Sequence, residues 1–170
     1  MKIKIPIRLL NIEGDGFHLQ VKMVINGKKA NAILDTGASK TVFDKTRIHH
    51  FLVTEKLKDN ERLSTGLGTA SMQSHVVVLK NLKLGKLSVN DYPAVVLDLN
   101  HVNQTYLQLG LEPIDGVIGS DLLNEYSALV DYGKKVLVLK TGKKEKKVKK
   151  KKSAKKKPAS SKKKKTSRKK

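Results

Sequence analysis

The stretch Ile33-Leu34-Asp35-Thr36-Gly37-Ala38-Ser39 decides the fold that this sequence predicts. Its two leading apolar residues indicate the end of a strand anchored in a core, so Asp35 stands where the strand becomes a turn. Thr36 carries a hydroxyl that can hydrogen-bond across to a second copy, and Gly37 lets one backbone approach another closely. The pattern therefore predicts a carboxylate held on a tight turn at the end of a buried strand.

A second motif lies about 80 residues downstream, over residues 114–123, and reads IDGVIGSDLL. Two apolar residues precede Gly119, and Asp121 is predicted to cap a short helix that begins with two leucines. An Asp-Thr-Gly sequence alone is more often an ordinary turn, because Asp and Gly are favoured in turns for local reasons. The pairing of the two motifs is far more specific than either alone.

Together the motifs resemble those of the retropepsin-like (retroviral-type) aspartic protease family, over roughly residues 1 to 140. The resemblance implies an all-β fold, a partly closed barrel with one short C-terminal helix. It also implies an aspartic endopeptidase that binds an extended peptide substrate and needs neither a metal ion nor an organic cofactor.

The resemblance assigns roles to individual residues. Asp35 is the expected catalytic residue, and its expected supports are Thr36, Gly37, Ala38, Val117, Ile118 and Gly119. The segment Gly66-Leu67-Gly68 is expected to be the tip of a mobile flap that closes over the substrate. Two departures from retroviral enzymes stand out: Ser39 replaces a usual aspartate, and Ser120-Asp121 replaces a usual arginine.

One aspartate motif predicts two chains. Peptide hydrolysis of this kind needs one ionised carboxylate to activate water and one protonated carboxyl to bind the carbonyl oxygen. The sequence holds no second Asp-Thr-Gly or Asp-Ser-Gly. We therefore expect a homodimer in which two copies of Asp35 meet on the two-fold axis. Ala38 replaces the serine of pepsin-like enzymes, so we expect activity at mildly acidic to near-neutral pH.

The positive charge gathers at the C-terminal end of the chain. Residues 140–170 hold 19 of the 36 Lys and Arg residues and a single acid, Glu145. This composition predicts a protease domain over 1–141 and a disordered lysine-rich tail over 142–170, because the tail has little apolar surface to bury. Such a tail can bind DNA or RNA by charge attraction alone, can sit on anionic lipid, or can serve only solubility.

Outside the motifs the sequence predicts short strands joined by turns. The expected strands are 1–10, 17–25, 29–34, 75–84, 92–97, 128–132 and 135–139. Asn26-Gly27 is a strong hairpin signal. A short helical turn is expected within 41–50, a polar connection over 100–110 and a short helix over 121–126.

Two further interpretations stay open. The barrel can be a non-catalytic peptide-binding or scaffold module tethered to nucleic acid, or it can merely dimerise a functional tail. The chain has no cysteine, so it offers no thiol nucleophile and no cysteine-based zinc site. No stretch reaches transmembrane length, and the first residues alternate lysine with isoleucine, so a cytoplasmic protein is expected.

Overall fold

The structure is a computed structural model, and it describes residues 1–141 apart from 13, 15, 53–56, 60–63, 67–68 and 73. For residues 59, 64–66 and 69–72 only the backbone is described. The predicted tail over 142–170 lies outside the described residues.

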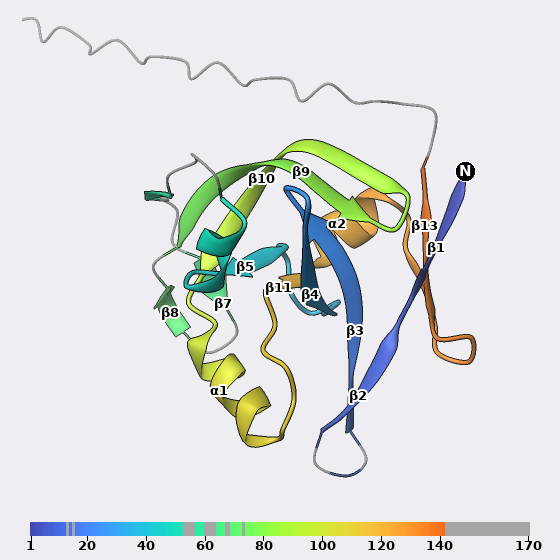
Figure 1. Cartoon of the computed structure of the whole chain (residues 1–170), viewed down its shortest axis with the longest axis horizontal. Helices are drawn as coiled ribbons and strands as arrows, with labels where there is room; N and C mark the ends of the chain where they lie inside the picture. The colour runs from blue at the N-terminus through green and yellow to red at the C-terminus, as the bar shows by residue number, and fades with distance from the viewer. Residues whose placement is uncertain are drawn as a thin grey trace, which may run out of the picture.

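Most of the described chain forms β-strands, which confirms the predicted β class (Figure 1). Eight strands form one sheet in the order β2-β3-β4-β11-β5-β10-β9-β6, and an extra pairing of β3 with β9 closes six of them into a barrel. The strands of this sheet are β2 (Arg8–Ile12), β3 (Gly16–Ile25), β4 (Lys28–Leu34), β5 (Val42–Asp44), β6 (Lys58–Asp59), β9 (His75–Leu84), β10 (Leu87–Leu97) and β11 (Gly116–Ile118).

A hairpin of β3 and β4 delivers Asp35 to the end of a buried strand, as the sequence predicts. Asn26 and Gly27 both have positive φ, at 47° and 85°, which matches the mirror-image turn that joins two-residue hairpins. Alternate residues of β3 point into the barrel, and the buried set is Leu19, Val21, Met23 and Ile25. Phe17 continues this alternation, but 52% of its surface is exposed at the far end of the strand.

A separate three-stranded sheet lies beside the barrel (Figure 1). Its order is β1-β13-β12, with β1 at Lys2–Pro6, β12 at Leu129–Asp131 and β13 at Val136–Lys140. The predicted strand over 1–10 is therefore two strands. The strand is interrupted at Ile7, and β1 and β2 belong to different sheets. The predicted hairpin around Gly133 is confirmed as β12 and β13.

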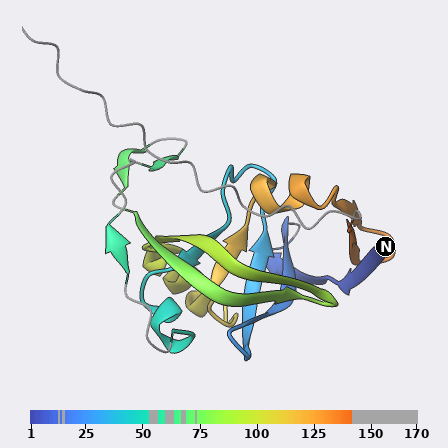
Figure 2. The same ribbon diagram turned by 90° about the horizontal axis from the view of Figure 1, so that it is seen from above.

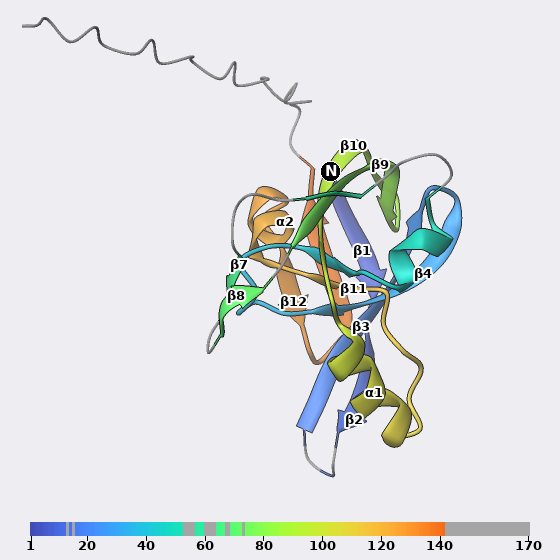
Figure 3. The same cartoon turned by 90° about the vertical axis from the view of Figure 1, so that its left-hand side faces the viewer.

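The helices differ in part from the prediction. Helix α2 (Ser120–Glu125) is the expected short C-terminal helix, while within the predicted helical turn over 41–50 the chain forms β5 followed by a 3₁₀ turn, η1 (Arg47–His50). The prediction of a polar connection over 100–110 is wrong, because α1 (Asn100–Gln108) occupies it. Figures 1 and 3 place α1 at the opposite end of the molecule from the β9–β10 hairpin, and Figure 2 shows that long hairpin crossing the front of the molecule.

Helix α1 escapes sequence analysis because it buries few side chains, and those are mainly polar. Asn103 is 7% exposed, and its side-chain amide donates to the Ile114 carbonyl oxygen at 3.1 Å and accepts from the Ile114 N–H at 2.8 Å. Tyr106 packs with Leu10 and Ile33 in a small second core and shares a hydrogen bond with His18. The helix therefore holds the segment that leads into β11.

Strands β7 (Ser64–Gly66) and β8 (Thr69–Met72) pair as the two-stranded hairpin where the flap is expected. Gly66 ends β7, and the predicted tip residues Leu67 and Gly68 lie outside the described residues. No helix in the described part of the chain combines the length and the apolar character that crossing a membrane requires.

Strand β11 threads between β4, with which it is parallel, and β5, with which it is antiparallel. Gly116 opens the strand where the space is tightest. A Cβ atom there would lie 2.5 Å from the Val42 carbonyl oxygen and 2.8 Å from the Phe43 ring. Both contacts are closer than van der Waals packing allows, so this position accepts only glycine without a shift of β5.

We predict that Gly116→Ala lowers the free energy of unfolding by about 2–3 kcal/mol, because a methyl group forces β5 away from β11. Urea denaturation followed by circular dichroism measures the change. Gly133→Ala is the matched control, since its Cβ would meet only the Asp131 carboxylate at 3.5 Å. Equal stability of the two variants would contradict the tight fit around β11.

Candidate functional site

The candidate site is the loop that follows β4. Asp35, Thr36 and Gly37 are exposed, and they follow Ile33 and Leu34, each of which is only 7% exposed. The Asp35 N–H donates to the Ile118 carbonyl oxygen at 3.0 Å, and the Ala38 N–H donates to the Asp35 carbonyl oxygen at 3.3 Å. The backbone of Asp35 is thus fixed while its side chain faces solvent.

The Asp35 carboxylate is oriented by its own loop. Its Oδ1 accepts the Gly37 N–H at 2.8 Å, which is an Asx-turn geometry. A Cβ atom on Gly37 would lie 3.2 Å from the same oxygen, so glycine keeps the space beside the carboxylate clear. The hydrogen bond from the Gly37 N–H therefore holds the rotamer of the Asp35 side chain.

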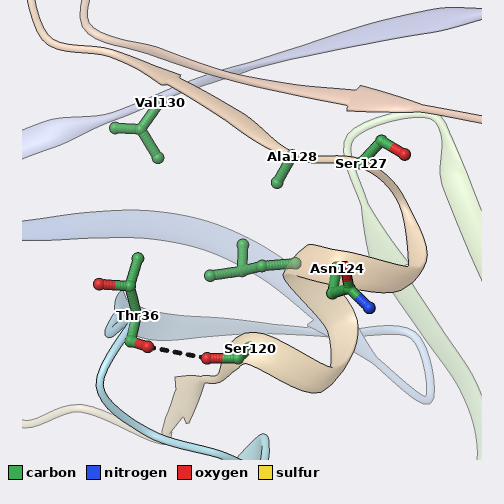
Figure 4. A pocket seen from close by; sticks show the side chains of 7 residues that line it. Thr36, Ser120, Asn124, Ser127, Ala128 and Val130 are labelled. Carbon is green, nitrogen blue, oxygen red and sulfur yellow. Dashed lines mark hydrogen bonds between the residues drawn. The ribbon is translucent and has the colours of Figure 1, made fainter.

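Ser120 holds the loop from below, a role that sequence analysis did not assign to it. Its hydroxyl lies 2.8 Å from the Thr36 carbonyl oxygen and 3.0 Å from the Ala38 carbonyl oxygen, and its N–H donates to Ala38 at 2.8 Å (Figure 4). The first residue of α2 therefore satisfies two carbonyl groups of the candidate loop.

A second set of hydrogen bonds joins the end of the loop to α2. Asp121 Oδ1 accepts the Thr41 N–H, the Thr41 hydroxyl and the Leu122 N–H, each at 2.8 Å. The Thr41 Oγ1 in turn accepts the Gly119 N–H at 3.0 Å. The prediction that Asp121 caps the helix needs correction: Gly119 occupies the cap position, and Asp121 lies in the first turn, where its charge also suits the helix dipole.

Gly119 lies where the loop and β11 come closest. A Cβ atom there would lie 2.4 Å from the Lys40 carbonyl oxygen and 2.8 Å from that of Ala38. Ile118 is fully buried, and Val117 is half-buried against the second core. The structure therefore brings the sequence-predicted residues of the two motifs into one unit, with β11 directly beneath the Asp35 loop.

An open cavity of about 270 Å³ adjoins this unit (Figure 4). Thr36 and Ser120 border it on one side, Ala128 and Val130 on the other, and Leu123, Asn124 and Ser127 complete it. Thr36 is exposed here, with its side chain free to meet another molecule.

Two other carboxylates near the motifs are structural. Asp44 is 1% exposed and accepts the N–H groups of Thr46, Arg47 and Leu99. Asp115 is 4% exposed and accepts from the Asn31 N–H at 2.8 Å and Arg47 Nε at 2.7 Å. Buried charges with such partners are committed to the fold. Within the described ranges, no group of three or more His, Asp or Glu is placed to hold a metal ion.

Burial raises the pKa of Tyr92 to about 12, reinforced by the nearby charges of Asp121 and Glu125 and opposed by Thr41. Burial also raises the pKa of Tyr106 to about 12. Since a raised tyrosine pKa favours the protonated folded state, this contribution to stability is complete below about pH 10 and is lost as the pH rises through about 12. Neither tyrosine therefore ionises near neutral pH.

The residue that sequence analysis missed is Thr41, which is 2% exposed and links Gly119 to Asp121. No local pattern marks it, since a threonine at the start of a strand is ordinary. The available signal was Asp121, an unusual acid two residues after Gly119. A carboxylate that is partly buried at this position requires hydrogen-bond donors from another segment of the chain.

Comparison with known proteins gives one family match and several structural likenesses. The aspartyl protease family model matches residues 21–122. No curated protein is similar enough in sequence to count as a match.

Three solved structures are similar to the chain. A retropepsin-like aspartic protease from Rickettsia conorii is 19% identical, with a TM-score of 0.47 over 82% of this chain and 88% of that chain. The retroviral protease-like domain of Ddi1 from Leishmania major is 15% identical, with a TM-score of 0.48 over 72% and 87%. The EIAV protease in complex with an inhibitor is 16% identical, with a TM-score of 0.47 over 72% and 99%.

We predict that Asp121→Ala destabilises the protein by about 2–3 kcal/mol, because it leaves the N–H of buried Thr41 without its acceptor. Urea denaturation measures the stability, and amide hydrogen exchange at Gly119 and Thr41 shows whether the loss is local. Glu125→Ala removes an exposed acid from the same helix and should change stability by less than about 0.5 kcal/mol. If Asp121→Ala were as mild as the control, the Thr41 link would not support the loop.

Proposed function

Because the chain belongs to the aspartyl protease family, whose model spans residues 21–122, we propose that it is an aspartic endopeptidase that works as a homodimer. The membership confirms the resemblance that the two sequence motifs predicted. In this proposal Asp35 of each subunit is the catalytic residue, and Thr36, Gly37, Ala38, Val117, Ile118 and Gly119 support it.

One observation carries the proposal: the Asp35 carboxylate is exposed, and hydrogen bonds fix the backbone of its loop to the neighbouring strand β11. The Asp35 N–H is bonded to Ile118, and its carboxylate is turned by the Gly37 N–H. By contrast, Asp44 and Asp115 are buried and fully engaged in hydrogen bonds. The second carboxyl group that peptide hydrolysis requires must therefore come from another copy of the chain.

The proposed reaction proceeds through one shared proton. The ionised Asp35 of one subunit takes a proton from water as the water oxygen forms a bond to the peptide carbonyl carbon. The protonated Asp35 of the other subunit gives its proton to the carbonyl oxygen, which forms a neutral diol. When the carbon–nitrogen bond breaks, the Asp35 that took the water's proton gives it to the leaving nitrogen. The other Asp35, now ionised, takes a proton from a diol hydroxyl, so that a carboxylic acid and an amine are released and the shared proton is restored.

Strand β12 supports a dimer on the side of the molecule that carries Thr36, because β12 is an edge strand of the sheet that the described residues form. Val130 and Ala128 border the cavity beside Thr36, and Leu129 and Tyr132 expose 58% and 62% of their surfaces. An unpaired strand edge with exposed apolar side chains is suited to pairing with a second copy. A two-fold axis near Thr36 would bring the two Asp35 loops together.

The proposed substrate is an extended peptide between the Asp35 loop and the β7–β8 hairpin. An extended peptide gains main-chain hydrogen bonds from both sides, and it fits a hairpin with a glycine-rich tip. Gly66, Leu67 and Gly68 are the proposed covering residues.

Ala38 favours operation at mildly acidic to near-neutral pH. Its side chain offers no hydroxyl to hydrogen-bond the ionised carboxylate, so the charged form is less stabilised than in pepsin-like enzymes, which carry serine there. Such a pH range suits the cytoplasmic location that we propose.

We predict that Asp35→Asn abolishes cleavage of a peptide library while leaving the thermal unfolding profile unchanged, because Asp35 is exposed and outside the core. Pepstatin, which binds aspartic peptidase sites, should inhibit the wild-type protein. Cleavage is measured by mass spectrometry between about pH 3 and pH 8.

Peptide retention without cleavage would instead support a non-catalytic binding module. Cleavage that survives Asp35→Asn would contradict the catalytic assignment, and an optimum near about pH 2 to 3 would contradict the role given to Ala38.

We also propose that residues 142–170 bind nucleic acid through charge attraction. The support is compositional, since the segment has 18 Lys and Arg residues and one acid, with no aromatic residue between the lysines. Deleting residues 142–170 should preserve turnover of a short peptide and should weaken salt-sensitive DNA binding. Unchanged DNA binding would show that the tail is not the main determinant.

A further inference from the structure

Cations line up on the outer side of the strand that runs from β1 into β2. Burial alternates without interruption from residue 2 to residue 8, with the isoleucines inside and Lys2, Lys4, Pro6 and Arg8 outside. Cations two residues apart on such a strand are about 6.6 Å apart along its axis. The strand therefore presents a regular basic row to solvent.

A cavity of about 260 Å³ opens at the Arg8 end of this row. Arg8 and Lys22 line it together with Gln20, and the remaining lining is Ile5, Pro6, Ile7 and Gly85. The cross-strand register pairs Arg8 with Gln20, so both side chains lie on the same face of the sheet, and Lys22 follows two residues along. None of the described lining residues is acidic.

Gln20 is the unusual member of this cavity. It is 3% exposed, and its side chain lines the open cavity and makes no hydrogen bond to another residue in the described part of the chain. Its amide can therefore bond to whatever occupies the cavity, and the two neighbouring cations favour an anionic occupant with acceptor atoms. An Arg, a Lys and an amide N–H together match a phosphate group.

The basic surface extends past the cavity. Lys29 and Lys83 pair with Val24 from its two sides, on the face that also carries Gln20 and Lys22. We name Lys4, Arg8, Lys22, Lys29 and Lys83 the basic face. All except Lys83 belong to β1–β4, and none forms an ion pair within the described residues.

Acidic residues near this surface have other partners. Asp131, on the outer side of the neighbouring sheet, pairs with Lys134 at 3.4 Å. Glu112 accepts a hydrogen bond at 3.2 Å from the side chain of Asn31, the cross-strand neighbour of Lys22, and keeps its charge. Among the described residues, the five cations of the basic face therefore outnumber the acids beside it.

The last described residues lie beside the same row. Lys140 lies directly opposite Lys2 in the β1–β13 register, an arrangement of like charges that is unfavourable without an anion. The Thr141 N–H donates to the Met1 carbonyl oxygen at 2.9 Å, so Thr141 lies at the Lys2 end of the row.

We propose that the basic face is a nucleic-acid-binding surface of the folded domain, and that the Gln20 cavity holds one backbone phosphate. A nucleic acid strand lying along β1–β2 places successive phosphates against Lys4, Arg8 and Lys22. The surface is distinct from the proposed catalytic loop, so binding is independent of the peptidase activity.

The arrangement favours a linear polyanion over a membrane. On the outer side of the strand, Pro6 is the only apolar residue between Lys4 and Arg8. Leu129 lies on the same face of the three-stranded sheet, because it pairs with Val138, the cross-strand partner of Lys4, but β13 separates it from the row. A membrane-binding surface would instead place apolar anchors among its cations.

The test uses the full chain and a fluorescently labelled single-stranded oligonucleotide of about 20 nucleotides, with binding measured by anisotropy at several salt concentrations. The double variant Arg8→Gln with Lys22→Gln should weaken binding about 20-fold at about 0.1 M salt and reduce the salt slope by about 1.4, because each lost contact removes about 0.7. The matched control, Lys45→Gln with Lys58→Gln, removes two exposed lysines that lie away from β2, one in the turn after β5 and one on β6, and should leave the slope unchanged.

Gln20→Leu isolates the phosphate site because it preserves charge, and it should weaken binding about threefold without changing the slope. Gln20→Glu places a carboxylate in the same cavity and should weaken binding further. This variant tests the site even if Gln20→Leu does not fold.

Equal behaviour of the Arg8/Lys22 variant and its control would overturn the proposal, since the tail would then account for all binding. The proposal would also be overturned if the protein bound vesicles with about 30% phosphatidylserine more strongly than it bound the oligonucleotide, and if the Arg8/Lys22 variant lost only the vesicle binding. That result would indicate a membrane-binding surface.

Discussion

The hydrogen bond from the Asp35 N–H to the Ile118 carbonyl oxygen is the interaction on which the rest of the structure depends. It joins β4 to β11, two strands that are parallel and far apart in sequence, at the point where the candidate loop begins. It can form only because Gly116 and Gly119 let β11 pass within contact distance of the neighbouring backbone. A side chain at either position would separate the loop from its support.

This constraint explains why polar residues gather around the end of β11. The loop needs its carbonyl groups satisfied, and the hydroxyl of Ser120 and the carboxylate of Asp121 meet that need from the first turn of α2. At the other end of β11, Asn103 fixes the segment that leads into the strand. Side-chain hydrogen bonds thus fix the strand at both ends. The Asp35 carboxylate is exposed, and the backbone that carries it is rigid.

Much of the fold could be predicted from the sequence because its signals are local. The Asn26-Gly27 turn and the alternation in β3 each follow from neighbouring residues. Each of the two motifs is likewise a short local pattern. Helix α1 could not be predicted, since its inward contacts include the polar Asn103 and the helix lacks an apolar stripe. The role of Thr41 was also hidden, because its partners become neighbours only after the chain folds.

The central claim is that two copies of Asp35 form one catalytic site, and mixing subunits tests it most directly. Wild-type protein is equilibrated with an equal amount of the Asp35→Asn variant, and peptide cleavage is compared with the same total amount of wild type. If each site needs both carboxyls, random pairing leaves about one quarter of the activity. A value of about one half would mean that each chain acts alone, and would contradict the account.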